Sequence, residues 1–192
     1  MTGEASPARK RAANGRFAST PGASSEPAPE AKPLELYLLR HADAGDSRLW
    51  TEDDAVRPLS KKGRRQAKNL ARLLKDLGFR VDAVITSPLL RAAQTAKPVA
   101  KATGVAAMTD ERLGYDFGKS ALAAILKELP ADVHRVVLVG HDPGFTDVAS
   151  LLAGTPIAMA KGALVRFDLA ERKVRSGAGD LRWLLPPEAV AR

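Results

Sequence analysis

Residues 34–43 read Leu-Glu-Leu-Tyr-Leu-Leu-Arg-His-Ala-Asp, and the first six form a Leu-rich run that predicts a β-strand over 34–39. The run ends directly at Arg40 and His41. Similar runs at 81–86 and 135–139 predict two more strands, and the last is apolar enough to be buried on both faces of a sheet.

Stretches of helical periodicity separate these runs. One helix can begin at a capping Ser60 and end at Gly78. A second follows Pro88 and ends at Gly104, and Pro98 inside it predicts a kink or an early end. Two more helices are expected over 120–129 and 145–153, and two antiparallel edge strands over 162–168 and 180–185. This alternation is typical of an α/β fold.

Residues 1–33 differ in composition from the rest of the 192-residue chain. Met1 and Phe17 are their only large apolar side chains, so we expect a disordered, basic tail rich in Pro, Ala and Ser. Residues 34–192 are long enough for one domain with a sizeable core. The chain has a net charge of +8, of which the tail holds +2, so the domain carries +6.

The composition excludes several classes of protein. Without cysteine, the chain cannot form disulfide scaffolds, thiolate zinc sites or iron–sulfur clusters. It has neither an apolar run of roughly 18 residues nor the apolar segment of a secretory signal, so we expect a soluble, cytoplasmic protein without membrane contact. The basic excess favours anionic partners, but no nucleic-acid-binding motif accompanies it, so nucleic acid is not the expected partner.

Polar side chains follow each of these three strands at the point where the strand ends. They are Arg40 and His41 after the first, Ser87 and Arg91 after the second, and His141 after the third. Because ligands of open α/β sheets bind outside the carboxyl ends of the strands, we expect these side chains to form one site.

This set of side chains suits a phosphate better than a metal ion. A catalytic zinc typically takes three protein ligands, whereas each of these histidines has only one Asp beside it. Arg40 and Arg91 can donate bidentate hydrogen bonds to a phosphoryl group. A neutral imidazole can then attack phosphorus and become phosphohistidine. The expectation is phosphoryl-transfer chemistry without a metal or cofactor.

Three motifs resemble those of the histidine phosphatase superfamily. They are Leu-Leu-Arg-His-Ala at 38–42, Ser-Pro-Leu-Leu-Arg-Ala-Ala-Gln-Thr at 87–95 and Val-Gly-His-Asp-Pro at 139–143. Ala42 replaces the family's glycine, which is a mild departure if the backbone there is not left-handed. The short domain, Asp-Ala at 43–44 and Val-Arg-Pro-Leu-Ser at 56–60 look most like the small bacterial phosphohistidine phosphatases of the SixA type.

The resemblance covers about residues 34–185 and implies both a fold and residue roles. The fold is phosphoglycerate-mutase-like, a three-layer α/β sandwich with a mostly parallel central sheet flanked by helices. His41 is implied as the nucleophile, with Arg40, Arg91 and His141 completing the phosphate pocket.

Three further residues each have two interpretations. Arg57 either binds substrate from the loop after His41 or is a solvated basic residue before a helix. Ser87 either binds phosphate or caps its helix. Glu111 is a candidate general acid, like the glutamate that larger family members have between the second and third motifs, with Asp110 as the alternative.

The leading hypothesis is a metal-independent phosphatase acting on phosphohistidine in a protein or on a small phosphorylated molecule. The segment around Glu111 matches the family's general acid only loosely. A poor acid favours phosphohistidine as the substrate, because the protonated imidazole of phosphohistidine is displaced more easily than a sugar hydroxyl. One alternative is a phosphomutase of the same family, although the chain has little material for a lid. The other is a non-catalytic phosphate-binding regulatory module, which retention of both histidines disfavours.

Overall fold

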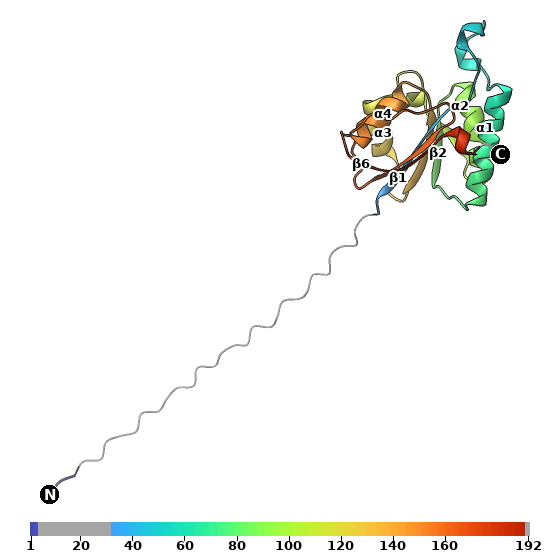
Figure 1. The fold of residues 1–192 in the computed structure, drawn as a ribbon. Helices are drawn as coiled ribbons and strands as arrows, with labels where there is room; N and C mark the ends of the chain where they lie inside the picture. The colour runs from blue at the N-terminus through green and yellow to red at the C-terminus, as the bar shows by residue number, and fades with distance from the viewer. Residues whose placement is uncertain (4–31, 191–192) are drawn as a thin grey trace. The chain divides into compact units, whose positions relative to one another are not determined.

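A six-stranded sheet runs through the centre of the computed structural model, which describes residues 1–3 and 32–190 (Figure 1). The strand order is β3-β2-β4-β1-β5-β6. The strands are β1 (Leu34–Arg40), β2 (Ala83–Thr86), β3 (Ala107–Thr109), β4 (Arg135–Gly140), β5 (Leu164–Leu169) and β6 (Gly179–Leu185). The chain divides into Met1–Glu30 and Ala31–Arg192. The expected disordered tail at 1–33 falls almost wholly outside the described residues, so it stays a prediction.

The pairing of the strands is mostly parallel. β1 runs parallel to β4, β4 to β2, and β2 to β3. β5 pairs antiparallel with β1, and β6 antiparallel with β5, which confirms the expected antiparallel edge. Sequence reasoning did not find β3, because all three of its residues are exposed and no hydrophobic pattern marks them.

Four helices cover the two faces of the sheet (Figure 1). The helices α1 (Lys61–Asp76) and α2 (Leu90–Thr103) lie on one face, and α3 (Lys119–Glu128) and α4 (Gly144–Ala153) lie on the other. This arrangement confirms the three-layer α/β sandwich. Within the described ranges, no helix is long and apolar enough to cross a membrane.

The helix α2 ends at Gly104 as predicted, and of the two alternatives that Pro98 left open, the early end is excluded. The helix continues through Pro98 to Thr103 and ends at Gly104, whose φ is 75°. Ala96 and Val99, on either side of the proline, are fully buried in the core between α2 and the sheet. This packing holds the helix together against the roughly 3 kcal/mol that an internal proline costs.

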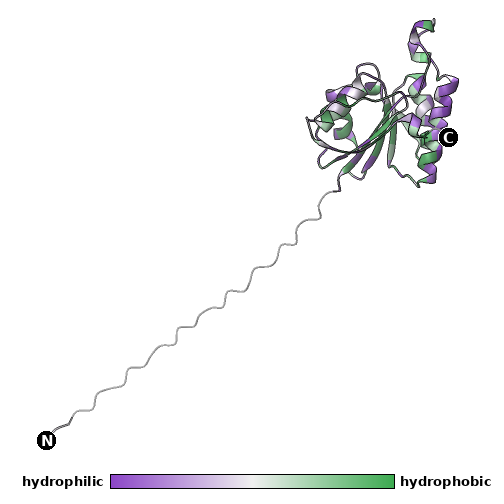
Figure 2. Cartoon of the chain, viewed as in Figure 1, coloured by the Kyte–Doolittle hydropathy of each residue, from purple (hydrophilic) through white to green (hydrophobic). Residues whose placement is uncertain are grey.

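The core is divided by the sheet, and β1 contributes to both halves. Leu36 and Leu38 pack with α3 and α4, whereas Tyr37 and Leu39 pack with α1 and α2. Successive strand side chains point to opposite faces, so a strand covered on both sides needs an unbroken apolar run. Figure 2 shows this distribution, with hydrophobic colours in the strands and hydrophilic colours on the outer side of α1. The Leu-rich run therefore buries β1 and leaves Arg40 and His41 at the carboxyl end of the strand, where the parallel strands of the sheet terminate together.

The first turn of α1 packs closely against the loop after His41. Ser60 caps the helix through its hydroxyl, which accepts the Gly63 N–H at 3.0 Å and donates to the Asp43 carboxylate at 2.5 Å. An added Cβ on Gly63 would lie 1.9 Å from the Asp43 carbonyl oxygen. The helix and the loop can therefore approach this closely only with glycine at position 63.

We predict that Gly63→Ala destabilises the protein, although alanine is the better helix former by about 1 kcal/mol. The steric conflict is with backbone, which yields little, so we expect a net loss of roughly 1–3 kcal/mol. Urea denaturation of both variants measures this loss, with Gly118→Ala as the control because its Cβ would meet nothing within 4 Å. Equal stability of the two variants would contradict the close packing.

Candidate active site

The ends of β1 and β4 bring two histidines together. In this parallel pair Arg40 lies opposite Gly140, and the His41 N–H donates to the Gly140 carbonyl at 2.8 Å. His41 and His141 therefore lie side by side at the carboxyl ends of the two strands, with their ring centroids 5.0 Å apart. The adjacent strand β2 pairs with β4 on its other side and ends at the same edge.

A cavity of about 620 Å³ opens at this edge of the sheet. It is lined by Arg40, His41, Asp43, Gly45, Asp46, Ser47, Arg57, Arg91, Tyr115, His141, Asp142 and Lys161. Five of these residues are site candidates from the sequence, whereas Ser87 and Glu111 do not line the cavity. Four basic side chains therefore line the cavity beside the two histidines, against three carboxylates, Asp43, Asp46 and Asp142.

His41 is buried, and a backbone carbonyl fixes its tautomer. Nδ1 lies 2.7 Å from the Ala42 carbonyl oxygen, which can only accept, so Nδ1 carries the proton and Nε2 keeps a free lone pair. Burial lowers the pKa of His41 to about 4; the Ala42 bond opposes this shift, while Arg91 and Arg40 add to it. The imidazole is thus neutral at neutral pH, as a nucleophile must be.

Ala42, where the family has glycine, fits without backbone strain. Apart from glycines, only Thr2 among the described residues has a positive φ, so Ala42 is not left-handed. Its methyl group is fully buried and packs with Ala44, Leu59 and Ala67. The substitution therefore adds a small apolar contact beneath the nucleophile.

Ser87 holds the His141 ring through a buried hydrogen bond. His141 Nε2 and the Ser87 hydroxyl are hydrogen-bonded at 2.8 Å, and the same hydroxyl accepts the Leu89 N–H at 3.2 Å. Burial is the main cause that lowers the pKa of His141 to about 3, with His41 and Arg91 adding to it. Ser87 is fully buried, so the structure positions it against His141 rather than at the cavity surface.

Arg40 is tied to the residue that follows His141. One of its Nη atoms lies 2.7 Å from the Asp142 carboxylate and donates to the Met159 carbonyl. Its Nε is buried and has no hydrogen-bond partner among the described residues, and the same is true of Arg91 Nε. The two guanidinium groups are thus oriented by the protein, but each keeps one hydrogen-bond donor without a partner among the described residues.

Asp54 links the other two arginines, and sequence reasoning did not find it. Its carboxylate accepts from Arg57 Nε at 2.6 Å and from the Tyr115 hydroxyl at 2.6 Å, and lies 3.0 Å from Arg91 Nη2. Burial alone would raise the pKa of Asp54, but the bonds from Tyr115 and Arg57 and the charge of Arg91 lower it to about 2. Asp54 therefore stays ionised and fixes the two guanidinium groups at the cavity.

The sequence pattern of the histidine phosphatase superfamily (branch 1) matches residues 36–132, half of the chain. The chain belongs to the histidine phosphatase superfamily. It is 31% identical over 166 residues to an uncharacterized protein of Picosynechococcus sp., covering 80% of this chain and all of the relative.

Relatives named as phosphatases agree with the membership of this chain in the superfamily. The chain is 29% identical over 160 residues to the phosphohistidine phosphatase SixA of Escherichia coli K12, covering 80% of this chain and 94% of that protein. The structure of the protein histidine phosphatase SixA complexed with tungstate has a TM-score of 0.70 and 26% identity, covering 82% of this chain and all of the other. These relationships support assignment of the chain as a phosphatase enzyme.

The candidate general acid of this histidine phosphatase lies outside the cavity. Glu111 is exposed and lines a neighbouring, more apolar hollow of about 640 Å³, which shares Tyr115 with the cavity. Asp110, the alternative, is engaged by Arg112 through a bond of 2.7 Å. Neither carboxylate is brought to the two histidines. Nor, within residues 1–3 and 32–190, do three His, Asp or Glu side chains form a group that could hold a metal ion.

Sequence reasoning missed Tyr115, Lys161 and Asp54 because nothing in their local sequence distinguishes them. Tyr115 lies in the segment after β3 and reaches Asp54 across the fold. Its ring faces His141 at 6.3 Å and the Arg91 guanidinium at 5.9 Å. Tyr115 therefore lies beside His141 and Arg91 in the wall of the cavity, a position that only the folded chain reveals.

We predict that the stability of the phosphatase falls as pH drops from about 6.5 to 4 and that His41→Gln weakens this dependence. The ordinary pKa of histidine is 6.5, whereas that of folded His41 is about 4. Between these values the unfolded chain binds the extra proton, so acid favours unfolding. Loss of the imidazole should remove on the order of 3 kcal/mol of pH dependence.

Denaturant titrations of both proteins across this pH range measure the effect. Above about pH 7 the imidazole is neutral in both states, so the two stability curves should run parallel there. A variant whose curve keeps the full wild-type slope between pH 6.5 and 4 would show that His41 is not held neutral by the fold.

Proposed function

We propose that this protein is a metal-independent phosphatase that forms a phosphohistidine at His41, with phosphohistidine in proteins as the preferred substrate and a small phosphorylated metabolite as the alternative. The observation that carries the proposal is the neutral His41 imidazole, with its proton held on Nδ1 and Nε2 free in a cavity lined by three arginines. Residues 34–192 hold every group that the proposal uses, and the tail over 1–33 is proposed to add no catalytic group.

The proposed reaction has two steps at His41. Nε2 attacks phosphorus, the bond between phosphorus and the leaving group breaks, and the leaving group takes a proton from solvent. Water then attacks the phosphohistidine and the N–P bond breaks, which releases inorganic phosphate, returns a proton to solvent and leaves Nε2 with its lone pair. Arg40, Arg57 and Arg91 would stabilise the equatorial oxygens in both steps, together with His141.

The carboxylates of the cavity favour a substrate with a good leaving group. A hydrogen bond from Ser60 lowers the pKa of Asp43, and one from Arg48 lowers the pKa of Asp46, so both are ionised and hold no proton to donate. Glu111 would act as the general acid only for a leaving group that extends into the neighbouring hollow. Phosphohistidine needs the least help, and the relative named phosphohistidine phosphatase SixA supports the same substrate class.

We predict that brief incubation with a phosphorylated substrate places phosphate on His41, because Nε2 of this residue has a free lone pair and the residue lines the cavity. An alkaline quench preserves the acid-labile N–P bond, and mass spectrometry of the peptides locates the phosphate. His41→Ala should abolish turnover and labelling while the protein stays folded. The reaction is run with and without EDTA, which should make no difference.

Two results would contradict this proposal. Phosphate on His141 with none on His41 would reverse the two roles. Activity that disappears in EDTA and returns with a divalent ion would contradict the metal-independent mechanism. A His141→Ala protein serves as the matched variant, since it should still accept phosphate on His41 but more slowly.

We predict that Arg91→Lys lowers kcat by roughly 10²–10³-fold, the usual cost of losing one transition-state donor. Arg91 already uses its Nη atoms on the Asp54 backbone carbonyl and carboxylate, so a lysine cannot hold Asp54 and meet a phosphoryl oxygen together. Steady-state kinetics on an aryl phosphate measures this loss. Arg112→Lys is the control, because Arg112 pairs with Asp110 and Glu128 outside the cavity. Equal activity of both variants would remove Arg91 from the site.

A further inference from the structure

The outer face of α1 carries a continuous stripe of basic side chains. Helical geometry of about 100° per residue places six of them within a sector of about 100°, whose centre lies about 120° around the helix from the centre of the buried face. The stripe consists of Lys61, Arg64, Arg65, Lys68, Arg72 and Lys75, all exposed. None of the six forms an ion pair with a described residue.

This basic stripe is not needed for the packing of the helix. The buried face of α1 consists of Gly63, Ala67, Leu70, Ala71 and Leu74, which complete the core on that side. Like charges three and four residues apart on a helix repel one another and destabilise it. The stripe therefore costs the free protein stability, and its positive charge is available to an anionic partner.

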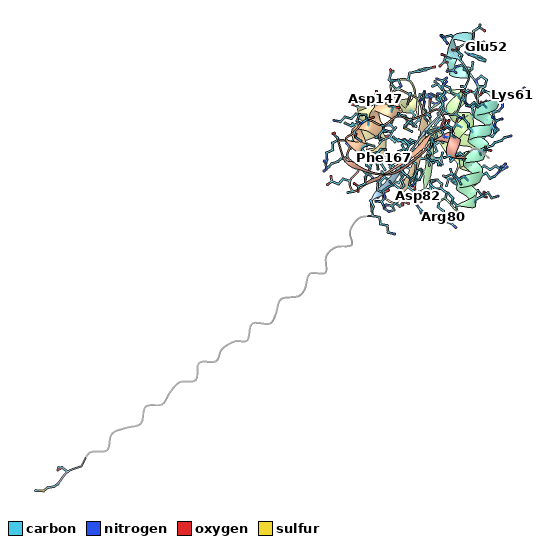
Figure 3. The ribbon with its side chains drawn as sticks, in the orientation of Figure 1. Glu52, Lys61, Arg80, Asp82, Asp147 and Phe167 are labelled. Carbon is cyan, nitrogen blue, oxygen red and sulfur yellow. The ribbon has the colours of Figure 1, made fainter. Side chains whose placement is uncertain are left out.

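The basic stripe begins at the rim of the cavity. Asp43 lines the cavity and accepts a hydrogen bond from Ser60, the residue that caps α1. Figure 3 shows Lys61 at the end of α1 nearer the loop that carries Glu52, and Arg80 at the opposite end. At 1.5 Å per residue the stripe from Lys61 to Lys75 extends over about 21 Å. A molecule bound along it would reach the cavity with one end.

Apolar side chains are exposed beside the same cavity. Leu49 and Val56, on the loop after His41, are 81% and 49% exposed, and Tyr115 is 60% exposed. Tyr115 lines the cavity and bonds to Asp54, two residues before Val56. Exposed apolar and aromatic groups beside a charged rim are typical of a surface that buries against another protein. Phosphate contacts to nucleic acid would not use them.

We propose that the basic stripe and these three apolar side chains form a docking surface for an acidic protein that carries the phosphorylated side chain into the cavity. This inference rests on the proposed function and specifies its substrate as a protein with an acidic surface. A second copy of the chain is a poor occupant, because it would bring an identical positive stripe. Residues 1–33 are also poorly suited, because their net charge is +2.

Two synthetic peptides test the docking surface. Each has about 20 residues, long enough at ~3.3 Å per residue to span from the cavity along the stripe. Each carries one central phosphohistidine, flanked by glutamates in one peptide and by glutamines in the other. The wild-type protein should hydrolyse the glutamate peptide with a kcat/KM at least about tenfold higher at low salt, and added salt should reduce this preference.

A charge-reversed protein should lose the preference. The stripe variant combines Arg65→Glu, Lys68→Glu and Arg72→Glu, and the control variant combines Lys101→Glu, Lys127→Glu and Arg175→Glu, which make the same change in net charge on exposed positions elsewhere. The stripe variant should treat both peptides alike, and the control should keep most of the preference. Both should hydrolyse free phosphohistidine at the wild-type rate, which also shows that they are folded.

Three outcomes would overturn the docking surface. The first is equal rates of the wild-type protein on the two peptides, and the second is an equal loss of the glutamate preference in the two variants. The third is a stripe variant that loses binding to a DNA oligonucleotide but keeps the glutamate preference. Fluorescence anisotropy with the unphosphorylated glutamate peptide measures docking without turnover. If the wild-type protein fails to hydrolyse free phosphohistidine, the proposed function fails, whereas weaker peptide binding by the stripe variant alone would still support the surface.

Discussion

The parallel pairing of β1 with β4 is the constraint on which the site depends. The hydrogen bond from the His41 N–H to the Gly140 carbonyl continues the ladder one residue beyond β1, so His41 and His141 leave adjacent strands at the same level. A slip of this register would separate the two imidazoles and also turn Leu36 and Leu38 away from their half of the core. The packing that stabilises the sheet thus also sets the distance between the two histidines.

Each arginine of the site has a carboxylate partner before any substrate binds. Asp142 holds Arg40, and Asp54 holds Arg57 and Arg91, so buried guanidinium groups have carboxylate partners. Without these partners, the cost of burying the cations would oppose folding. The histidines meet the same low-dielectric surroundings by remaining neutral. The result is a cavity lined by four basic side chains around a histidine that burial keeps neutral.

The helix α1 connects the site to the outer surface of the protein. Its first turn packs against Asp43 through Gly63, its inner face completes the core, and its outer face carries the basic stripe. The net charge of +6 on the domain is therefore concentrated in part on one helix that starts at the cavity rim, rather than being spread evenly. If docking and catalysis both act on a phosphorylated protein, this one helix would position the substrate relative to His41.

Local sequence pattern alone was enough to predict most of the elements and the strand ends with their reactive residues, because hydrophobic periodicity reports burial and strand-end position reports the edge of the sheet. It did not reveal β3, whose residues are exposed, and it left open whether α2 ends early at Pro98, which packing of Ala96 and Val99 decides. The link from Tyr115 to Asp54 joins residues 61 positions apart, and Ser87 reaches His141 across 54 positions. Such contacts have no periodicity to read, since they exist only when separate loops are brought to one sheet edge, and so the tertiary structure alone decided them.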